Sequence, residues 1–140
     1  MRLLFPFLVA ALCSCHKQAV TPQAPPTAAQ GQIVAVEPTR LVTAPASAPV
    51  RWRWRVELAP PLTLPGNPNS SPPAFSQVKT FSFAVTDTVV FHRGARLSFT
   101  YQVLPWSPPQ WYSTAEALSM APVPPYFNLP EVTISNVQAL

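Results

Sequence analysis

Few side chains in this sequence are suited to acid–base or nucleophilic catalysis. The chain of 140 residues contains five acidic residues and two histidines. No two carboxylates have the spacing of a catalytic pair, and a Ser- or Cys-based nucleophilic site would depend on His92 alone. The sequence also lacks a glycine-rich phosphate loop and an oxygen-rich calcium loop. We therefore expect a protein that is not an enzyme and uses no cofactor.

The densest group of metal-binding residue types consists of Cys13, Cys15 and His16. A stable zinc site needs a further ligand, and no second cluster of Cys and His follows along the sequence. We therefore expect no metal site. Because no cysteine follows Cys15, the rest of the chain cannot form a disulfide and must rely on burial for its stability.

The first residues have the pattern of an export signal. Met1 and Arg2 precede an apolar run at residues 3–12, which is about ten residues long and too short to span a bilayer. The stretch Leu12-Cys13-Ser14-Cys15 that closes this run resembles the lipobox of bacterial lipoproteins. The resemblance implies a signal peptide at residues 1–14 and a membrane anchor of thioether-linked lipid, with palmitate-type chains, on Cys15.

Two alternatives to this assignment differ in how the cysteines are used. Cys13 fits the lipobox less well than Cys15, because bulky Leu12 would stand where a small residue is expected. An ordinary secretory signal cleaved near Ser14 would instead leave a free cysteine. In lipobox proteins of enteric-type bacteria, aspartate after the anchor favours the inner membrane, and this position is His16. The resemblance thus implies an outer-membrane lipoprotein that faces the periplasm.

The composition indicates one folded domain with proline in its loops. The sequence has 20 prolines and three glycines, with 48% hydrophobic and 10% charged residues. Disordered chains usually combine low hydrophobicity with high net charge, so a folded domain is expected. The formal charge of +4 is too small and dispersed for nucleic-acid binding. We expect a lipid-anchored Pro-rich linker at residues 15–32 and the domain at residues 33–140.

The clearest element is a strand at residues 50–59. Apolar Trp52, Trp54, Val56 and Leu58 alternate there with charged Arg51, Arg53, Arg55 and Glu57. An extended chain places the two sets on opposite faces. We interpret the apolar set as core rather than as a ligand platform, and the arginines as a solvated outer face. The alternative for the arginines is a basic stripe that binds phosphate or acidic headgroups.

Other segments also indicate a β-rich chain. We expect strands at residues 33–36, ended by Pro38, at 78–86 and at 131–137, and a hairpin that joins 88–91 to 97–104 around Gly94. Ser113 and Glu116 have the spacing of a capping box and predict a short helix up to Met120. The predicted fold class is all-β: a small β-sandwich of immunoglobulin-like architecture, with a small partly open β-barrel as the alternative. The expected core includes Trp52, Trp54, Phe81, Phe83, Leu97, Phe99 and Tyr101.

Aromatic residues in Pro-rich loops are the expected site of partner binding. They are Trp106, Trp111, Tyr112, Tyr126 and Phe127. Loops of this kind usually run over the surface, and Trp and Tyr are enriched at binding hot spots. The alternative is that Trp106 and Trp111 fold back and plug an open end of the sandwich.

The expected function is that of a non-enzymatic envelope lipoprotein that docks on a cell-envelope assembly as a structural or accessory component. Its partners would be the membrane, through the lipid anchor, and an envelope protein, with no nucleic acid. One alternative is a module that binds a glycan or a small apolar ligand. Another is a Pro-rich outer-membrane lipoprotein of phage type.

Overall fold

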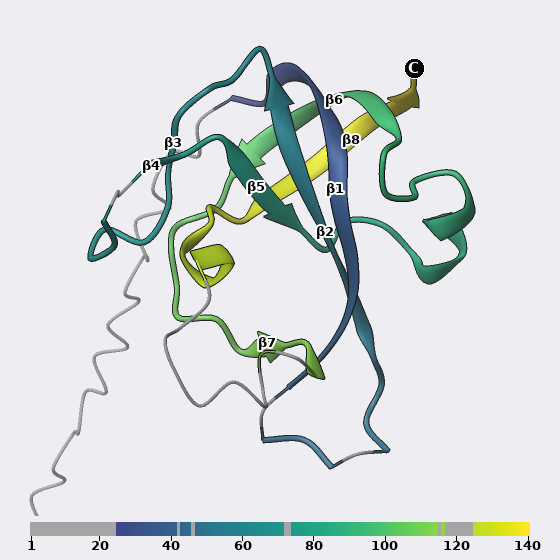
Figure 1. The fold of residues 1–140 in the computed structure, drawn as a ribbon, viewed down its shortest axis with the longest axis vertical. Coiled ribbons are helices and arrows are strands. Elements are labelled where there is room, and N and C mark those ends of the chain that lie inside the picture. Colours follow the sequence, from purple (N-terminus) through teal and green to yellow (C-terminus); the bar gives the residue numbers. More distant parts are fainter. Residues whose placement is uncertain (1–24, 42, 46, 72–73, 115, 117–124) are drawn as a thin grey trace, which may run out of the picture.

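The computed structural model describes residues 25–41, 43–45, 47–71, 74–114, 116 and 125–140, and Figure 1 shows its fold. The lipobox-like segment with Cys15 lies outside these residues. The described chain is mostly β, with one six-stranded sheet and one two-stranded sheet, and neither closes into a barrel. Within the described part, no helix is long and apolar enough to cross a membrane.

The large sheet has the strand order β5-β2-β1-β6-β8, and β7 pairs with the end of β1. Its strands are β1 (Thr27–Leu41), β2 (Arg51–Ala59), β5 (Gln77–Thr80), β6 (Arg96–Val103), β7 (Trp111–Tyr112) and β8 (Val132–Ala139). The small sheet consists of β3 (Leu64–Pro65) and β4 (Ala74–Phe75). Two short 3₁₀ helices, η1 (Val85–Val89) and η2 (Pro125–Asn128), connect strands of the large sheet.

The two outer strands of the large sheet meet at one point. Lys79 of β5 and Glu131, just before β8, form an isolated parallel bridge. The backbone N–H of Lys79 donates to the carbonyl of Pro130 at 2.9 Å. The Ser82 hydroxyl, just after β5, accepts a bond from the N–H of Ile134 in β8. The sheet therefore bends until its first and last strands come into contact.

β1 is longer than the sequence analysis predicts. It starts at Thr27, so residues 27–32, predicted as linker, belong to the sheet. Gly31 lies where β1 comes close to β2, and a Cβ at this position would lie only 2.6 Å from the Cγ1 of Val56. Pro38 does not end the strand. Proline has no N–H to donate, but β6 pairs with β1 only at residues 27–32. Pro38 therefore pairs with β2 on one side and takes no donor from β6 on the other.

The predicted inward face of β2 is confirmed. Trp54, Val56 and Leu58 are buried, and the Trp54 indole donates to the Phe91 carbonyl at 2.8 Å. Trp52 is only partly buried against the same cluster. The buried cluster consists of Ile33, Trp54, Val56, Leu58, Val78, Leu97, Phe99, Tyr101, Val132 and Ile134, and Phe83 packs against it.

The chain between β5 and β6 differs from the prediction. β5 ends at Thr80, and the prediction that Phe81 belongs to the core is wrong. Phe81 is half-buried, and the guanidinium carbon of Arg51 lies 4.1 Å from the centre of its ring. Residues 88–91 form no hairpin arm, because the Asp87 carboxylate accepts from the N–H of Ala84 and stabilises η1 instead. β6 pairs with β1 and β8. Gly94 does form the predicted turn, with a φ of 93°.

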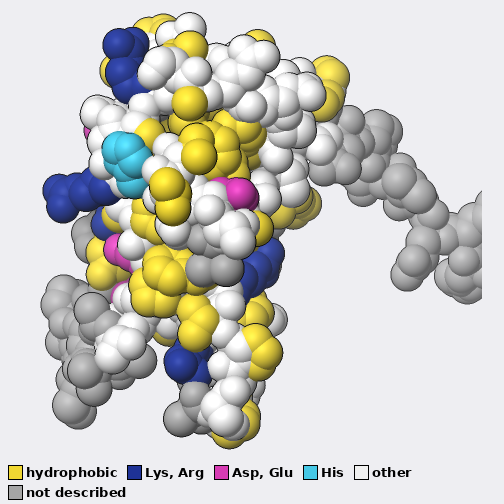
Figure 2. Space-filling model, turned by 90° about the vertical axis from the view of Figure 1, so that its right-hand side faces the viewer, with side chains coloured by type: hydrophobic (Ala, Val, Ile, Leu, Met, Phe, Trp, Pro, Cys, Tyr) yellow, Lys and Arg dark blue, Asp and Glu magenta, His cyan; other side chains and the backbone are white. Residues whose placement is uncertain are grey.

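The surface reflects the low content of charged residues. Figure 2 shows groups of hydrophobic side chains separated by uncharged polar groups, with only scattered Lys, Arg, Asp and Glu. Some large apolar side chains are well exposed, and Val89 at the end of η1 is 82% exposed. Recognition that uses charged side chains must therefore come from the few places where these gather.

Candidate functional site

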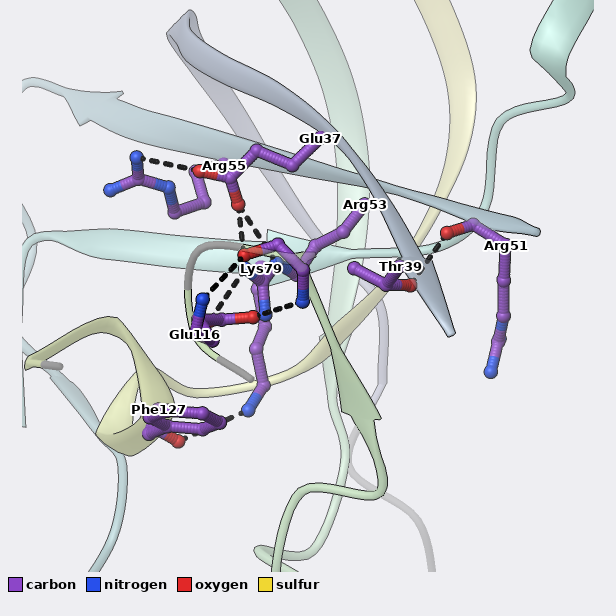
Figure 3. Close-up of polar contacts among 9 residues, drawn as sticks. Glu37, Thr39, Arg51, Arg53, Arg55, Lys79, Glu116 and Phe127 are labelled. Atoms are coloured by element: carbon purple, nitrogen blue, oxygen red, sulfur yellow. Dashed lines mark hydrogen bonds and ion pairs between the residues drawn. The ribbon is translucent and has the colours of Figure 1, made fainter. Parts of the chain in front are cut away.

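The charged side chains gather on the outer face of β2. Arg51, Arg53 and Arg55 alternate with the apolar residues of this strand, and Figure 3 shows the acidic groups that meet Arg53 and Arg55. The prediction of a solvated arginine face is wrong for Arg53, which is only 2% exposed. Its partners come from other parts of the chain, so the strand pattern alone could not indicate this burial.

Glu37 is the first partner of Arg53. It lies directly opposite Arg53 in the antiparallel pairing of β1 and β2, a position where oppositely charged side chains attract. The Nε and Nη2 of Arg53 donate to its Oε2 at 3.2 and 2.6 Å. The predicted first strand ended before Glu37, and the observed register includes a shift between Ile33 and Ala35, so the sequence analysis did not predict this pair.

Glu116 is the second partner, and it also caps a turn. The N–H of Ser113 donates to its Oε2, and its own N–H donates to the Ser113 hydroxyl, which confirms the predicted capping box. The remaining oxygen, Oε1, accepts from the Nη2 of Arg53 at 2.7 Å. Thr114 and Glu116 are helical, and the rest of the predicted helix lies outside the described residues.

These two carboxylates determine the ionisation of Arg53. Burial alone would lower the pKa of its guanidinium, but the hydrogen bonds and charges of Glu116 and Glu37 outweigh that effect and raise the pKa above its ordinary value. Arg53 is thus a permanently charged side chain held inside the protein by two anions. Such an arrangement fixes the positions of β1, β2 and the Ser113 turn relative to one another.

Lys79 lies on the buried side of the same cluster. It is 5% exposed, and its Nζ donates to the carbonyl of Phe127 in η2 at 3.2 Å. Burial lowers the pKa of Lys79, the charge of Arg53 lowers it further, and the carboxylate of Glu131 opposes both effects. Lys79 therefore ties η2 to β5 through its side chain.

Arg55 is the open member of the cluster. Its Nη2 donates to the Oε1 of Glu37 at 3.2 Å, and its guanidinium lies 4.7 Å from the centre of the Tyr126 ring. The Arg55 side chain remains 21% exposed. Its Nε is buried and has no hydrogen-bond acceptor among the described residues.

The five aromatic residues predicted to bind a partner fall into three environments. Tyr112, Tyr126 and Phe127 come together, with ring centres 4.9 Å apart for Tyr112 and Phe127 and 6.1 Å apart for Tyr126 and Phe127. Phe127 is buried, while Tyr112 and Tyr126 are half-buried. Trp111 is half-buried in β7, with the Arg51 guanidinium 5.4 Å from its ring. Trp106 is 36% exposed.

A hollow of about 470 Å³ lies beside this cluster. It is lined by Arg55, Phe75, Ser76, Gln77, Tyr126 and Leu129, which come from β2, from β4 and β5, and from η2 and the residue after it. A second hollow, of about 530 Å³, lies near Ala28, Ala59 and Phe99, and no charged side chain lines it. Of these two hollows, the one beside Arg55 therefore offers a ligand a charged hydrogen-bond donor.

The described residues contain no group of three or more His, Cys, Asp or Glu side chains able to hold a metal ion. Sequence reasoning did not identify Glu37, Lys79 or Glu116 as parts of a cluster. Comparisons of the chain with protein family models, with curated proteins and with solved structures found no match.

Proposed function

We propose that this protein is a non-enzymatic, lipid-anchored protein of the cell envelope that acts by binding. The carboxylates of Glu37 and Glu116 are both engaged by arginine, and Glu116 also holds the Ser113 turn. Groups tied in this way stabilise a surface and are poorly placed to transfer protons. The lipobox-like stretch that ends at Cys15 supports outer-membrane anchoring.

The proposed docking face is the end of the sheet where the aromatic loops meet. The carrying observation is that Trp111 and Tyr126 stay only partly buried although both are held under guanidinium groups. The Phe127 ring contacts both Tyr112 and Tyr126, which joins the two aromatic loops. A rigid aromatic surface loses little entropy on docking, which suits contact with a protein of an envelope assembly.

Site-specific photocrosslinking in intact cells tests the docking face. A photoreactive phenylalanine analogue at Trp106 should yield one discrete cross-linked product whose partner mass spectrometry identifies as an envelope protein. The matched control is the same analogue at Val89, which is even more exposed and lies at the end of η1. Equal patterns at the two positions would contradict a docking surface at the aromatic loops.

Membrane fractionation with intact mass measurement tests the anchor. Cys15→Ser should move the protein to the soluble fraction and remove the acyl mass, whereas Cys13→Ser should leave it membrane-bound. The reverse result would assign the lipid to Cys13, and two membrane-bound variants would contradict lipid anchoring at both positions.

The bent sheet, whose outer strands touch at Lys79 and Glu131, supports the partly open barrel more than the immunoglobulin-like sandwich. The hollow beside Arg55 favours one second candidate function, that of a ligand-binding module. Both functions can use the same end of the molecule.

A further inference from the structure

Within the proposed binding function, on which this assignment rests, we infer that the hollow beside Arg55 binds an uncharged saccharide unit. Its volume of about 470 Å³ falls within the usual range for small-ligand sites. Three of its six lining side chains are polar, and the other three are Phe75, Tyr126 and Leu129. A pyranose ring likewise has an apolar part and a polar part, with C–H groups on its faces and hydroxyl groups around its edge.

Arg55 provides the strongest donor in the hollow. Its interactions with described residues are the single bond from Nη2 to Glu37 and the contact with the Tyr126 ring. No residue that the structure describes therefore accepts from Nη1, whose N–H groups we assign to an acceptor from outside. Arg53, two residues earlier, has instead placed both Nε and Nη2 on carboxylates.

The charges of the cluster favour an uncharged ligand. The positive charges of Arg53, Arg55 and Lys79 are matched by the negative charges of Glu37, Glu116 and Glu131, so these six side chains sum to zero. A bidentate hold on a carboxylate or phosphate needs two available nitrogens on one edge of the guanidinium. In Arg55 the Nε is buried and Nη2 already holds Glu37. A single hydroxyl or carbonyl oxygen suits the remaining donor better.

Ser76 and Gln77 complete the polar side of the hollow. Neither side chain makes a hydrogen bond with any residue that the structure describes, although both line the space next to Arg55. A hydroxyl and a primary amide both donate and accept, which matches the hydroxyl groups of a sugar. Phe75 and Tyr126 add aromatic surface for the C–H face.

An extended peptide fits this place less well. The carbonyl of Ser76 already accepts from the N–H of Leu58, and the N–H of Lys79 already donates to Pro130. A peptide strand that adds to a sheet needs a free row of such backbone groups. These two backbone groups are already bonded, so we assign recognition in the hollow to side chains.

Isothermal titration of the full chain in a zwitterionic detergent without sugar headgroups tests the assignment. The probe is a tetramer of β-1,4-linked N-acetylglucosamine, and a tetramer of galacturonic acid is the charged counterpart. The wild type should bind the neutral tetramer, and Arg55→Gln should weaken binding by about tenfold. Arg96→Gln is the matched control, since Arg96 is exposed on β6 and lies outside the hollow, and its affinity should equal that of the wild type.

Gln77→Ala guards against a folding defect in Arg55→Gln, and it should also weaken binding while leaving the far-UV circular dichroism spectrum unchanged. Three results would overturn the inference: no heat with the neutral tetramer, tighter binding of the acidic tetramer, or equal losses in the Arg96 and Arg55 variants. If the Trp106 cross-link persists while the sugar does not bind, the saccharide site is wrong and the docking function stands. If the sugar binds and the cross-link is absent, the docking function fails instead.

Discussion

Arg53 and Arg55 lie two positions apart on the same face of β2, and both contact Glu37. Arg53 is enclosed by Glu37 and Glu116 and is 2% exposed, whereas the Arg55 side chain is 21% exposed and lines a hollow. Two arginines on one face of a strand thus differ in role: Arg53 forms buried ion pairs, and Arg55 presents a hydrogen-bond donor to the hollow. The difference comes from Glu116, which covers one guanidinium and does not contact the other.

This contrast separates stability from recognition along a single strand. A buried charge that loses its partners destabilises the fold strongly, whereas a half-exposed one can change with little structural effect. We therefore expect substitutions at the two arginines to have opposite balances of folding and binding effects.

The largest effect is expected for Arg53→Ala. It leaves the buried carboxylate of Glu116 without its cation, and breaking a buried pair in this way typically costs about 3–5 kcal/mol. Urea unfolding followed by circular dichroism should show this loss. Arg51→Ala, on the same face but exposed, removes only cation–π contacts with Phe81 and Trp111 and should lose no more than about 1–2 kcal/mol. Similar losses at both positions would remove the distinction between enclosed and open arginines.

A smaller effect is expected for Tyr126→Ala. The ring lies 4.7 Å from the Arg55 guanidinium and 5.5 Å from that of Arg53, and cation–π contacts of this kind are worth about 1–2 kcal/mol when partly shielded. Thermal and urea unfolding should show a loss of this size. Trp106→Ala, which removes an exposed ring, should stay within about 0.5 kcal/mol of the wild type. A larger loss for Trp106 would indicate that its loop covers the core.

The pH dependence of the unfolding free energy should report the burial of Lys79. Burial lowers the pKa of Lys79 in the folded chain, so the unfolded chain binds this proton more tightly. Stability should therefore rise with pH between the lowered pKa and the ordinary value of Lys. Lys79→Met removes this rise, and the difference in unfolding free energy between wild type and variant should grow as the pH rises toward 10.5, the ordinary pKa of Lys. Parallel profiles would mean that Lys79 is solvated.

The alternation at residues 50–59 was sufficient to predict β2 and the burial of Trp54, Val56 and Leu58. It could not predict the burial of Arg53, because one partner, Glu116, lies 63 residues away and reaches it only through the capped turn at Ser113. The local signal for that turn was correct. The turn's place against β2 depends on the whole chain, which a local pattern does not contain.

The prediction of a hairpin between residues 88–91 and 97–104 was wrong for the same reason: strand pairing depends on distant parts of the chain. Residues 97–103 alternate as a strand should, and the strand exists, but its partners are β1 and β8 rather than the nearest segment. Asp87 gives η1 a local hydrogen bond that competes with strand pairing. The hollow beside Arg55 was equally out of reach, since its lining comes from residues 55, 75–77, 126 and 129, which no single segment brings together.

The smallest effect on folding is expected for Arg55→Gln. This substitution removes one ion pair to Glu37, whose other oxygen is still held by Arg53, so no carboxylate is left without a cation. Half-exposed pairs contribute about 0.2–1 kcal/mol, and the loss in urea unfolding should stay within that range. The same variant should nevertheless lose about tenfold in affinity for the neutral tetramer, since it removes the one guanidinium that borders the hollow. Arg53→Gln should show the reverse balance, with a large loss of stability and, under conditions where it remains folded, unchanged binding. If Arg55→Gln unfolds the protein as strongly as Arg53→Gln does, both arginines are structural and the open side of the cluster has no separate role.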